Sequence, residues 1–155
     1  SLMEVTQTCV DILSRYLFET EVIETRADHA MTVDELKDCM LRAQDATYGD
    51  GLDKNVRHPY MWACKSHYYS TGRHFYNFPY AFGHLFALGV YNKYQEEGAS
   101  FLPKYDELLA SCGSDTIPNV TMTVGIDVRS VDYWRGALKV LRDEVEEFLR
   151  LTESK

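Results

Sequence analysis

Histidines and tyrosines gather in one part of this chain, and that part has no acidic residue. Residues 54–95 contain no Asp or Glu, although they hold four of the five histidines and 12 of the 20 aromatic residues. Tyrosine hydroxyls and imidazole N–H groups donate hydrogen bonds to carbonyl and carboxylate oxygens, and a nearby carboxylate would oppose negative charge that develops there. The composition therefore predicts a surface that binds such oxygens. A packed core of hydrogen-bonded Tyr and His is the alternative that composition leaves open.

The common motifs of metal and nucleophilic catalysis are missing from the sequence. No His is followed by Glu, so the HExxH motif of zinc peptidases is absent. Cys64 and His67 have a CxxH spacing, but no second ligand pair follows at the distance of a structural zinc site. GxSxG and the glycine-rich phosphate-binding loops are also absent. We therefore expect no metal ligands and no activated nucleophile in this chain.

The overall composition excludes several classes of partner. The formal net charge is −8, whereas general binding to nucleic acid or to an anionic membrane rests on a basic surface. No run of apolar residues is long enough for a transmembrane helix. The four cysteines, at positions 9, 39, 64 and 112, form no CxxC pair, which favours free thiols in a reducing compartment. The sequence thus predicts a cytoplasmic protein without nucleic-acid or membrane partners.

The elements that must position the His and Tyr side chains are predicted to be helices. A helix is expected up to about residue 27, and its apolar stripe consists of Val5, Cys9, Ile12, Leu13, Tyr16, Leu17 and Ile23. Thr32 followed by Glu35 is a capping box, which predicts a second helix that stops near Gly49. Residues 80–94 are apolar nearly all round, so we expect a helix that is buried on every side.

Three further helices are expected in the rest of the chain. Ser100 is the predicted N-cap of a helix with Pro103 in its first turn and its end at Cys112-Gly113. A short helix or turn is expected over residues 118–124, and Ser130 opens the last helix. The apolar seam predicted for that helix is Val131, Trp134, Leu138, Leu141, Val145 and Phe148. Residues 1–155 are therefore predicted to form a single all-α domain, a bundle-like lobe of several helices.

Several blocks of the sequence resemble one family of peptidases. The most specific is His67-Tyr-Tyr followed by His74-Phe-Tyr-Asn-Phe-Pro-Tyr-Ala-Phe-Gly-His-Leu, with His58-Pro-Tyr-Met-Trp-Ala before it. Val10-Asp-Ile-Leu-Ser-Arg-Tyr-Leu-Phe-Glu and Phe101-Leu-Pro-Lys-Tyr-Asp-Glu-Leu-Leu extend the similarity on both sides. Essentially the whole chain resembles the C-terminal part of the oligoendopeptidase F branch of the thimet-oligopeptidase-like zinc metallopeptidases.

The resemblance implies an all-α enzyme with a cleft, which hydrolyses short peptides in the cytoplasm. Its zinc is held by the two His of HExxH and a downstream Glu, and none of these ligands is present here. The opposite wall of the cleft carries a His and two Tyr that hold the substrate and the oxyanion of the tetrahedral intermediate. The matching positions are His67, Tyr76 and Tyr80, and His74 and Tyr69 are further candidates for substrate binding.

Three hypotheses follow from the residues and the resemblance together. In the first, the chain is the C-terminal lobe of a longer zinc oligopeptidase, inactive alone, and the missing N-terminal part carries the metal. In the second, it is a stand-alone helical module that binds peptides without cleaving them. In the third, it is a scaffold fragment without a ligand. The coding sequence upstream of Ser1 separates the first two, because an in-frame HExxH belongs only to the first.

Overall fold

Every regular element of the described chain is a helix. The computed structural model describes residues 2–153, and no strand occurs among them, which confirms the predicted all-α fold. The chain folds as two compact units, the first reaching to Phe82 and the second beginning at Gly83, and each is described by itself. No helix within residues 2–153 has both the length and the apolar character needed to cross a membrane.

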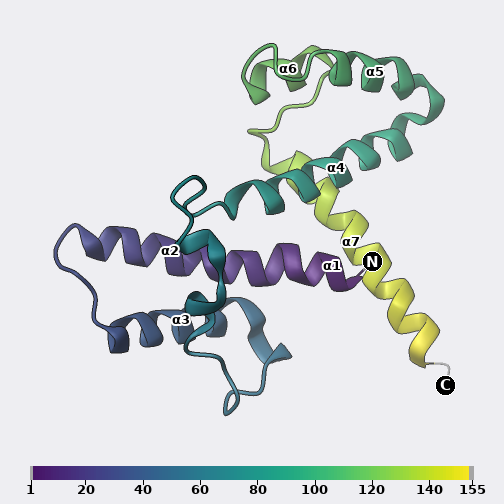
Figure 1. Cartoon of the computed structure of the whole chain (residues 1–155). Coiled ribbons are helices and arrows are strands. Elements are labelled where there is room, and N and C mark those ends of the chain that lie inside the picture. The colour runs from purple at the N-terminus through teal and green to yellow at the C-terminus, as the bar shows by residue number, and fades with distance from the viewer. Residues whose placement is uncertain (1, 154–155) are drawn as a thin grey trace. The chain divides into compact units, whose positions relative to one another are not determined.

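The first unit is built on a pair of helices. α1 (Leu2–Thr6), a π-helical segment (Gln7–Asp11) and α2 (Ile12–Arg26) follow one another as a continuous rod, as the prediction of one helix to about residue 27 requires. α3 (Val33–Tyr48) packs alongside α2 (Figure 1). The buried core of this pair consists of Phe18, Cys39, Met40 and Ala43. The pair is therefore the base on which the following segment rests.

Local signals set both ends of α3. The hydroxyl of Thr32 accepts a hydrogen bond from the backbone N–H of Glu35 at 3.3 Å, and the Glu35 carboxylate accepts one from the backbone N–H of Thr32 at 2.7 Å. The predicted capping box is thus confirmed, and it pairs N–H groups that a helix start leaves without partners. The helix ends before Gly49, whose φ of 53° is a conformation that glycine adopts without strain.

The face that α2 buries differs from the prediction. Four residues of the predicted apolar stripe are 37% to 55% exposed: Leu13, Tyr16, Leu17 and Ile23. The charged side chains of Asp11, Arg15 and Glu19 are buried instead. The predicted stripe is therefore wrong for most of this helix. Its buried face meets a polar partner, Asn77, that lies far along the chain, so that charged groups find hydrogen bonds on the inner side.

The segment between α3 and α4 is mostly irregular and lies against the helix pair. It contains three short 3₁₀ turns: Gly49–Gly51, Met61–Cys64 and Ser66–Tyr68. The side chains of Trp62 and Tyr68 pack against the core of α2 and α3. The Phe18 and Tyr68 rings meet at a centroid distance of 5.6 Å. The first half of the aromatic stretch is thereby attached to the helices that precede it.

The second unit is organised around two longer helices. α4 (Phe78–Glu97) begins in the first unit and continues into the second, where a 3₁₀ turn (Gly98–Phe101) leads to α5 (Leu102–Ala110). α6 (Ile117–Thr123) and α7 (Val131–Glu153) complete the chain, and Figure 1 shows α5 and α6 close together at one end of this unit. The buried core consists of Val90, Phe101, Leu108, Val120, Val124, Ile126 and Tyr133. The short helix predicted over residues 118–124 is therefore confirmed as α6.

The predicted caps of α5 and α7 have different outcomes. Pro103 lies in the first turn of α5 as expected, but Ser100 is not its cap. The Ser100 hydroxyl donates to the carbonyl oxygen of Glu97 at 2.7 Å, because a 3₁₀ turn occupies the place of the predicted helix start. Ser130 does open α7, since its hydroxyl accepts a hydrogen bond from the backbone N–H of Asp132 at 3.3 Å.

Two predictions of burial in this unit are corrected. The buried residues of α7 are Tyr133, Ala137, Val140 and Leu141. Of the predicted seam only Leu141 is among them, whereas Leu138 and Phe148 are 50% and 52% exposed, so the seam prediction is wrong. α4 was predicted to be buried all round, yet only Gly89 and Val90 are. Most of its other side chains are half-buried, and Phe78, Tyr80, Tyr91 and Tyr94 are exposed.

Candidate functional site

Three residues predicted to act together form one cluster in the first unit. The ring of His67 meets the ring of Tyr80 edge-on, at a centroid distance of 6.1 Å and an interplanar angle of 83°. The rings of Tyr76 and Tyr80 meet in the same way, at 5.9 Å and 85°. Edge-on contacts of this kind are favourable between aromatic rings and hold the rings at fixed angles to one another. We call this group, His67, Tyr76 and Tyr80, the His–Tyr cluster.

Backbone hydrogen bonds bring the three members of the cluster together. The backbone N–H of Phe75 donates to the carbonyl oxygen of His67 at 3.0 Å, which closes the loop between them. Phe75 has a φ of 52°, a left-handed conformation that is uncommon for an aromatic residue. α4 then begins at Phe78, with Pro79 in its first turn, so Tyr76 precedes the helix and Tyr80 lies in it.

The polar atoms of the cluster are open to a ligand. Tyr76 is 37% exposed and Tyr80 is 45% exposed, and His67 is half-buried. Within residues 2–153, neither tyrosine hydroxyl has a hydrogen-bond partner, and the same holds for the His67 ring. A tyrosine held only for packing would bury its ring and bond its hydroxyl to the backbone, as Tyr133 does with the carbonyl oxygen of Phe86 at 2.8 Å. The hydroxyls of Tyr76 and Tyr80 are not used in this way.

The two other candidates lie apart from the cluster. The Tyr69 hydroxyl donates to the carbonyl oxygen of Trp62 at 3.5 Å, and its side chain is 59% exposed. His74 is also exposed. No ring contact or hydrogen bond within the described chain joins either residue to the His–Tyr cluster. The structure therefore brings three of the five candidate residues together.

A positive charge beside the cluster was not foreseen from the sequence. The guanidinium of Arg73 lies over the ring of Tyr76, 5.9 Å from its centroid. Arg73 is exposed, and no acidic residue occurs between positions 54 and 95. The sequence shows only that Arg73 comes three residues before Tyr76. The loop between them is irregular, so this spacing does not predict that the guanidinium lies over the ring. The cluster thus carries hydrogen-bond donors and one cation without a neighbouring carboxylate in its own stretch.

Beneath the cluster lies a buried polar network that sequence reasoning also missed. The carboxamide of Asn77, which is fully buried, accepts a hydrogen bond from the Arg15 guanidinium at 3.2 Å and donates one to the Glu19 carboxylate. Arg15 is also ion-paired with Asp11, one turn earlier on the same rod. Burial raises the pKa of the Glu19 carboxyl, and the hydrogen bond from Asn77 opposes that shift. The charges of α2 are thereby tied to the segment that carries the cluster.

The described residues do not provide a metal site. No group of three or more His, Cys, Asp or Glu side chains converges as ligands anywhere in residues 2–153. The thiol of Cys64 is exposed and contacts the carbonyl oxygen of Tyr60 at 3.7 Å. The zinc that the resemblance implies does not fit the residues of this part of the chain. We therefore assign no chemical step here to a bound metal.

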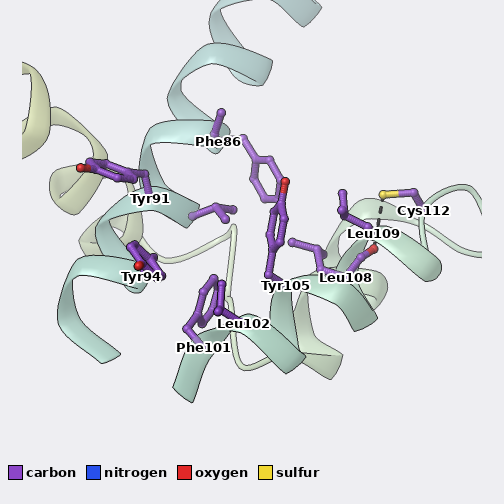
Figure 2. Close-up of a pocket in the computed structure, with 11 residues that line it drawn as sticks. Phe86, Tyr91, Tyr94, Phe101, Leu102, Tyr105, Leu108, Leu109 and Cys112 are labelled. Carbon is purple, nitrogen blue, oxygen red and sulfur yellow. Dashed lines mark hydrogen bonds between the residues drawn. The ribbon is translucent and has the colours of Figure 1, made fainter. Parts of the chain in front are cut away.

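The second unit has an apolar groove of about 510 Å³ that the sequence did not predict. Figure 2 shows side chains of α4, of the following 3₁₀ turn and of α5 projecting into it. No charged side chain lines it, and three tyrosines contribute its hydroxyl groups: Tyr91, Tyr94 and Tyr105. An apolar lining of this kind is typical of a packing or binding surface.

Comparisons with known proteins add no relative to this picture. No protein-family model, no curated protein and no solved structure matches the chain. The candidate function therefore rests on the geometry of the His–Tyr cluster and on the sequence resemblance described above.

Proposed function

We propose that this chain supplies the substrate-binding and oxyanion-binding wall of a zinc-dependent oligoendopeptidase of the oligoendopeptidase F type. In this proposal the enzyme hydrolyses short peptides in the cytoplasm, and the 155-residue chain is its C-terminal part, inactive alone. Zinc and the general base belong to the N-terminal part of the same polypeptide, which is the partner of this chain. His67, Tyr76 and Tyr80 act on the substrate from the opposite side.

The observation that carries the proposal is the open arrangement of the His–Tyr cluster. Two tyrosine hydroxyls and an imidazole come from one short segment, their rings are in contact, and their polar atoms have no partner within residues 2–153. Donors that are fixed in place before the substrate arrives stabilise a developing oxyanion without reorganising during the reaction. The absence of acidic residues over positions 54–95 supports this role, because the stretch itself adds no competing carboxylate.

The residues have distinct parts in this proposal. Tyr80 lies between the other two rings, and its hydroxyl donates to the oxygen that becomes negative when the peptide carbonyl turns tetrahedral. Tyr76 and His67 donate to neighbouring oxygens of the peptide backbone and hold the carbonyl in line. Arg73 adds a positive charge beside Tyr76, which favours an anionic group on the substrate.

A second candidate is a helical module that binds peptides without cleaving them. One observation favours it: the contacts that hold the cluster all come from residues of the first unit. The cluster is therefore held by contacts within this unit. In this case His67, Tyr76, Tyr80 and Arg73 bind peptide carbonyl and carboxylate groups, and no hydrolysis follows.

The upstream reading frame and a peptide hydrolysis assay distinguish the two candidates. The reading frame upstream of Ser1 is sequenced and expressed with the present chain, and hydrolysis of a quenched fluorescent peptide is measured with and without a zinc chelator. An upstream HExxH and chelator-sensitive hydrolysis are expected. A frame that begins beside Ser1, with peptide binding by the chain alone, favours the binding module. A chain that binds no peptide and has no such frame contradicts both candidates.

A further inference from the structure

The buried side-chain amide of Asn77, beneath the His–Tyr cluster, is hydrogen-bonded at one end to a cationic side chain and at the other to an anionic one. We infer that Asn77 is a positioning residue, whose clamp between Arg15 and Glu19 fixes the orientation of the segment that carries His67, Tyr76 and Tyr80. The inference rests on the proposed function in one respect, namely that the cluster binds a peptide. It adds the part of the fold that holds the cluster in its binding geometry.

An amide is suited to this place because it has one acceptor and one donor end. The Oδ1 atom of Asn77 accepts from Arg15 at 3.2 Å, and its Nδ2 donates to Glu19. Arg15 and Glu19 are four residues apart and so lie one turn apart on the same face of α2. The order of the two charges along the helix therefore fixes which way the amide points. An aspartate or a leucine of similar size would lose one or both of these hydrogen bonds.

The orientation of Asn77 is transmitted to the cluster through the backbone. Tyr76 is its immediate neighbour, and the carbonyl oxygen of Asn77 accepts from the backbone N–H of Tyr80 at 3.3 Å. The backbone N–H of Asn77 donates to the carbonyl oxygen of Phe75 at 2.9 Å. The directions in which the Tyr76 and Tyr80 side chains point therefore both depend on the backbone at Asn77. The left-handed conformation of Phe75 is disfavoured by itself, and the clamp two residues later offsets its cost.

Arg15, the cationic partner of Asn77 on α2, is itself held by further polar contacts. Asp11 is ion-paired with Arg15, and its carboxylate also accepts from the Tyr48 hydroxyl of α3 at 3.0 Å. Burial raises the pKa of Tyr48 to about 12, so this hydroxyl keeps its proton and remains a donor at neutral pH. Arg15 is therefore paired with a carboxylate that is itself held by α3 through Tyr48.

A purely structural role for such a network is the weaker explanation. Burying an ion pair costs desolvation, and apolar side chains of similar volume stabilise a core at least as well. Arg15 Nε has no hydrogen-bond partner within residues 2–153, so the network is not fully satisfied, but the hydrogen bonds at both ends of the Asn77 amide still restrict its orientation. This network is attached to the residue after Tyr76, whose carbonyl oxygen accepts from the backbone N–H of Tyr80, so a single geometry here matters for binding.

The experiment exchanges the donor and acceptor across the clamp. Asn77→Asp places a second carboxylate beside Glu19, and the double variant Glu19→Gln with Asn77→Asp reverses the hydrogen bond between residues 19 and 77, so that residue 19 donates and residue 77 accepts. In the double variant the new carboxylate accepts from both Arg15 and the glutamine amide. Asn55→Asp is the matched control, because Asn55 is exposed and lies in a loop. Each chain is studied by NMR, which reports nuclear Overhauser contacts between the His67, Tyr76 and Tyr80 rings.

Asn77→Asp is expected to lose the ring-to-ring contacts, and the double variant and Asn55→Asp are expected to retain them. Contacts that persist in Asn77→Asp would overturn the inference. So would a double variant that does not recover them, whether it is folded or not. A merely structural role predicts that melting temperature changes while the ring contacts stay as they are.

Peptide affinity is measured in the same set of proteins. Misplacing a single hydrogen-bond donor is expected to weaken binding about tenfold in Asn77→Asp, with recovery in the double variant. The ring contacts are observed without any ligand, so the two readouts fail independently. A wild-type chain that binds no peptide by itself contradicts the binding-module candidate, whereas unchanged ring contacts contradict the role of Asn77.

Discussion

The ring of Tyr133 lies directly against the backbone of Gly89. A methyl group added at Gly89 would come within 2.4 Å of the Cζ atom of Tyr133, closer than any real contact. The Tyr133 hydroxyl donates to the carbonyl oxygen of Phe86, so the ring has little room to move away. This close approach joins α4 to α7 in the core of the second unit.

Gly89→Ala is expected to lower the free energy of unfolding by about 1–3 kcal/mol, because the core must shift to admit the methyl group. Gly83→Ala is the control in the same helix: no atom lies within 4 Å of its added methyl group. For Gly83→Ala we expect the free energy of unfolding to rise by about 0.5–1 kcal/mol, since alanine is the better helix former. Urea unfolding of the three chains measures both. Equal effects at the two positions would contradict the packing described here.

Tyr80→Phe in the complete enzyme is expected to lower kcat by roughly 10²–10³ with little change in KM, because an oxyanion donor acts mainly in the transition state. Tyr94→Phe on the same helix is the control, since Tyr94 is exposed to a similar degree, 42% against 45%. Steady-state hydrolysis of a fluorescent peptide measures both. An unchanged kcat with a lowered melting temperature in Tyr80→Phe would assign the hydroxyl to structure alone.

The chain by itself is expected neither to hold zinc stoichiometrically nor to cleave peptides. Its His and Cys residues have no recognised ligand spacing, and a tight site needs three or four convergent groups. Metal analysis of the purified chain and a peptide cleavage assay measure this. One firmly bound zinc ion per chain, together with turnover, would contradict it.

The carboxyl of Glu35 is expected to titrate with a pKa of about 2, because the backbone N–H of Thr32 and the His29 ring bind its charged form. The folded pKa is below the unfolded one, so this group stabilises the fold above about pH 4.5, and that contribution is lost as the pH falls towards 2. Carbon-detected NMR measures the pKa. Glu35→Gln keeps a capping side chain but does not titrate, so the pH dependence of stability should flatten between these values.

Glu19 is expected to have the opposite effect on stability. Burial raises its pKa in the folded state, so the folded chain binds this proton more tightly than the unfolded chain does. Its contribution is therefore present below the unfolded value of about 4.5 and is lost as the pH rises through the folded value. Urea unfolding of the wild type, of Glu19→Gln and of the exposed control Glu24→Gln measures this. A Glu19→Gln chain with the same pH dependence as the wild type would contradict it.

The sequence by itself determined the features that depend on near neighbours. The all-α class, the capping box of Thr32 and Glu35, the end of α3 at Gly49 and the start of α4 near residue 80 were all predictable. Each rests on hydrogen bonds or backbone conformations within four residues, and such interactions are written directly into the local sequence. The residues of the His–Tyr cluster, which share one short segment, were named through the family resemblance and not through local interactions.

Only the tertiary structure decided which side of each helix is buried. The apolar stripe predicted for α2 is largely exposed, because Asp11, Arg15 and Glu19 face inward to partners such as Asn77, 62 residues beyond Arg15. Gly89 has no side chain, so the ring of Tyr133 fits against its backbone. The face of α7 that carries Tyr133 is therefore buried in place of the predicted seam. A helical period shows that two faces differ, but burial follows from the partners that meet them. Charged groups become interior groups when distant residues satisfy them.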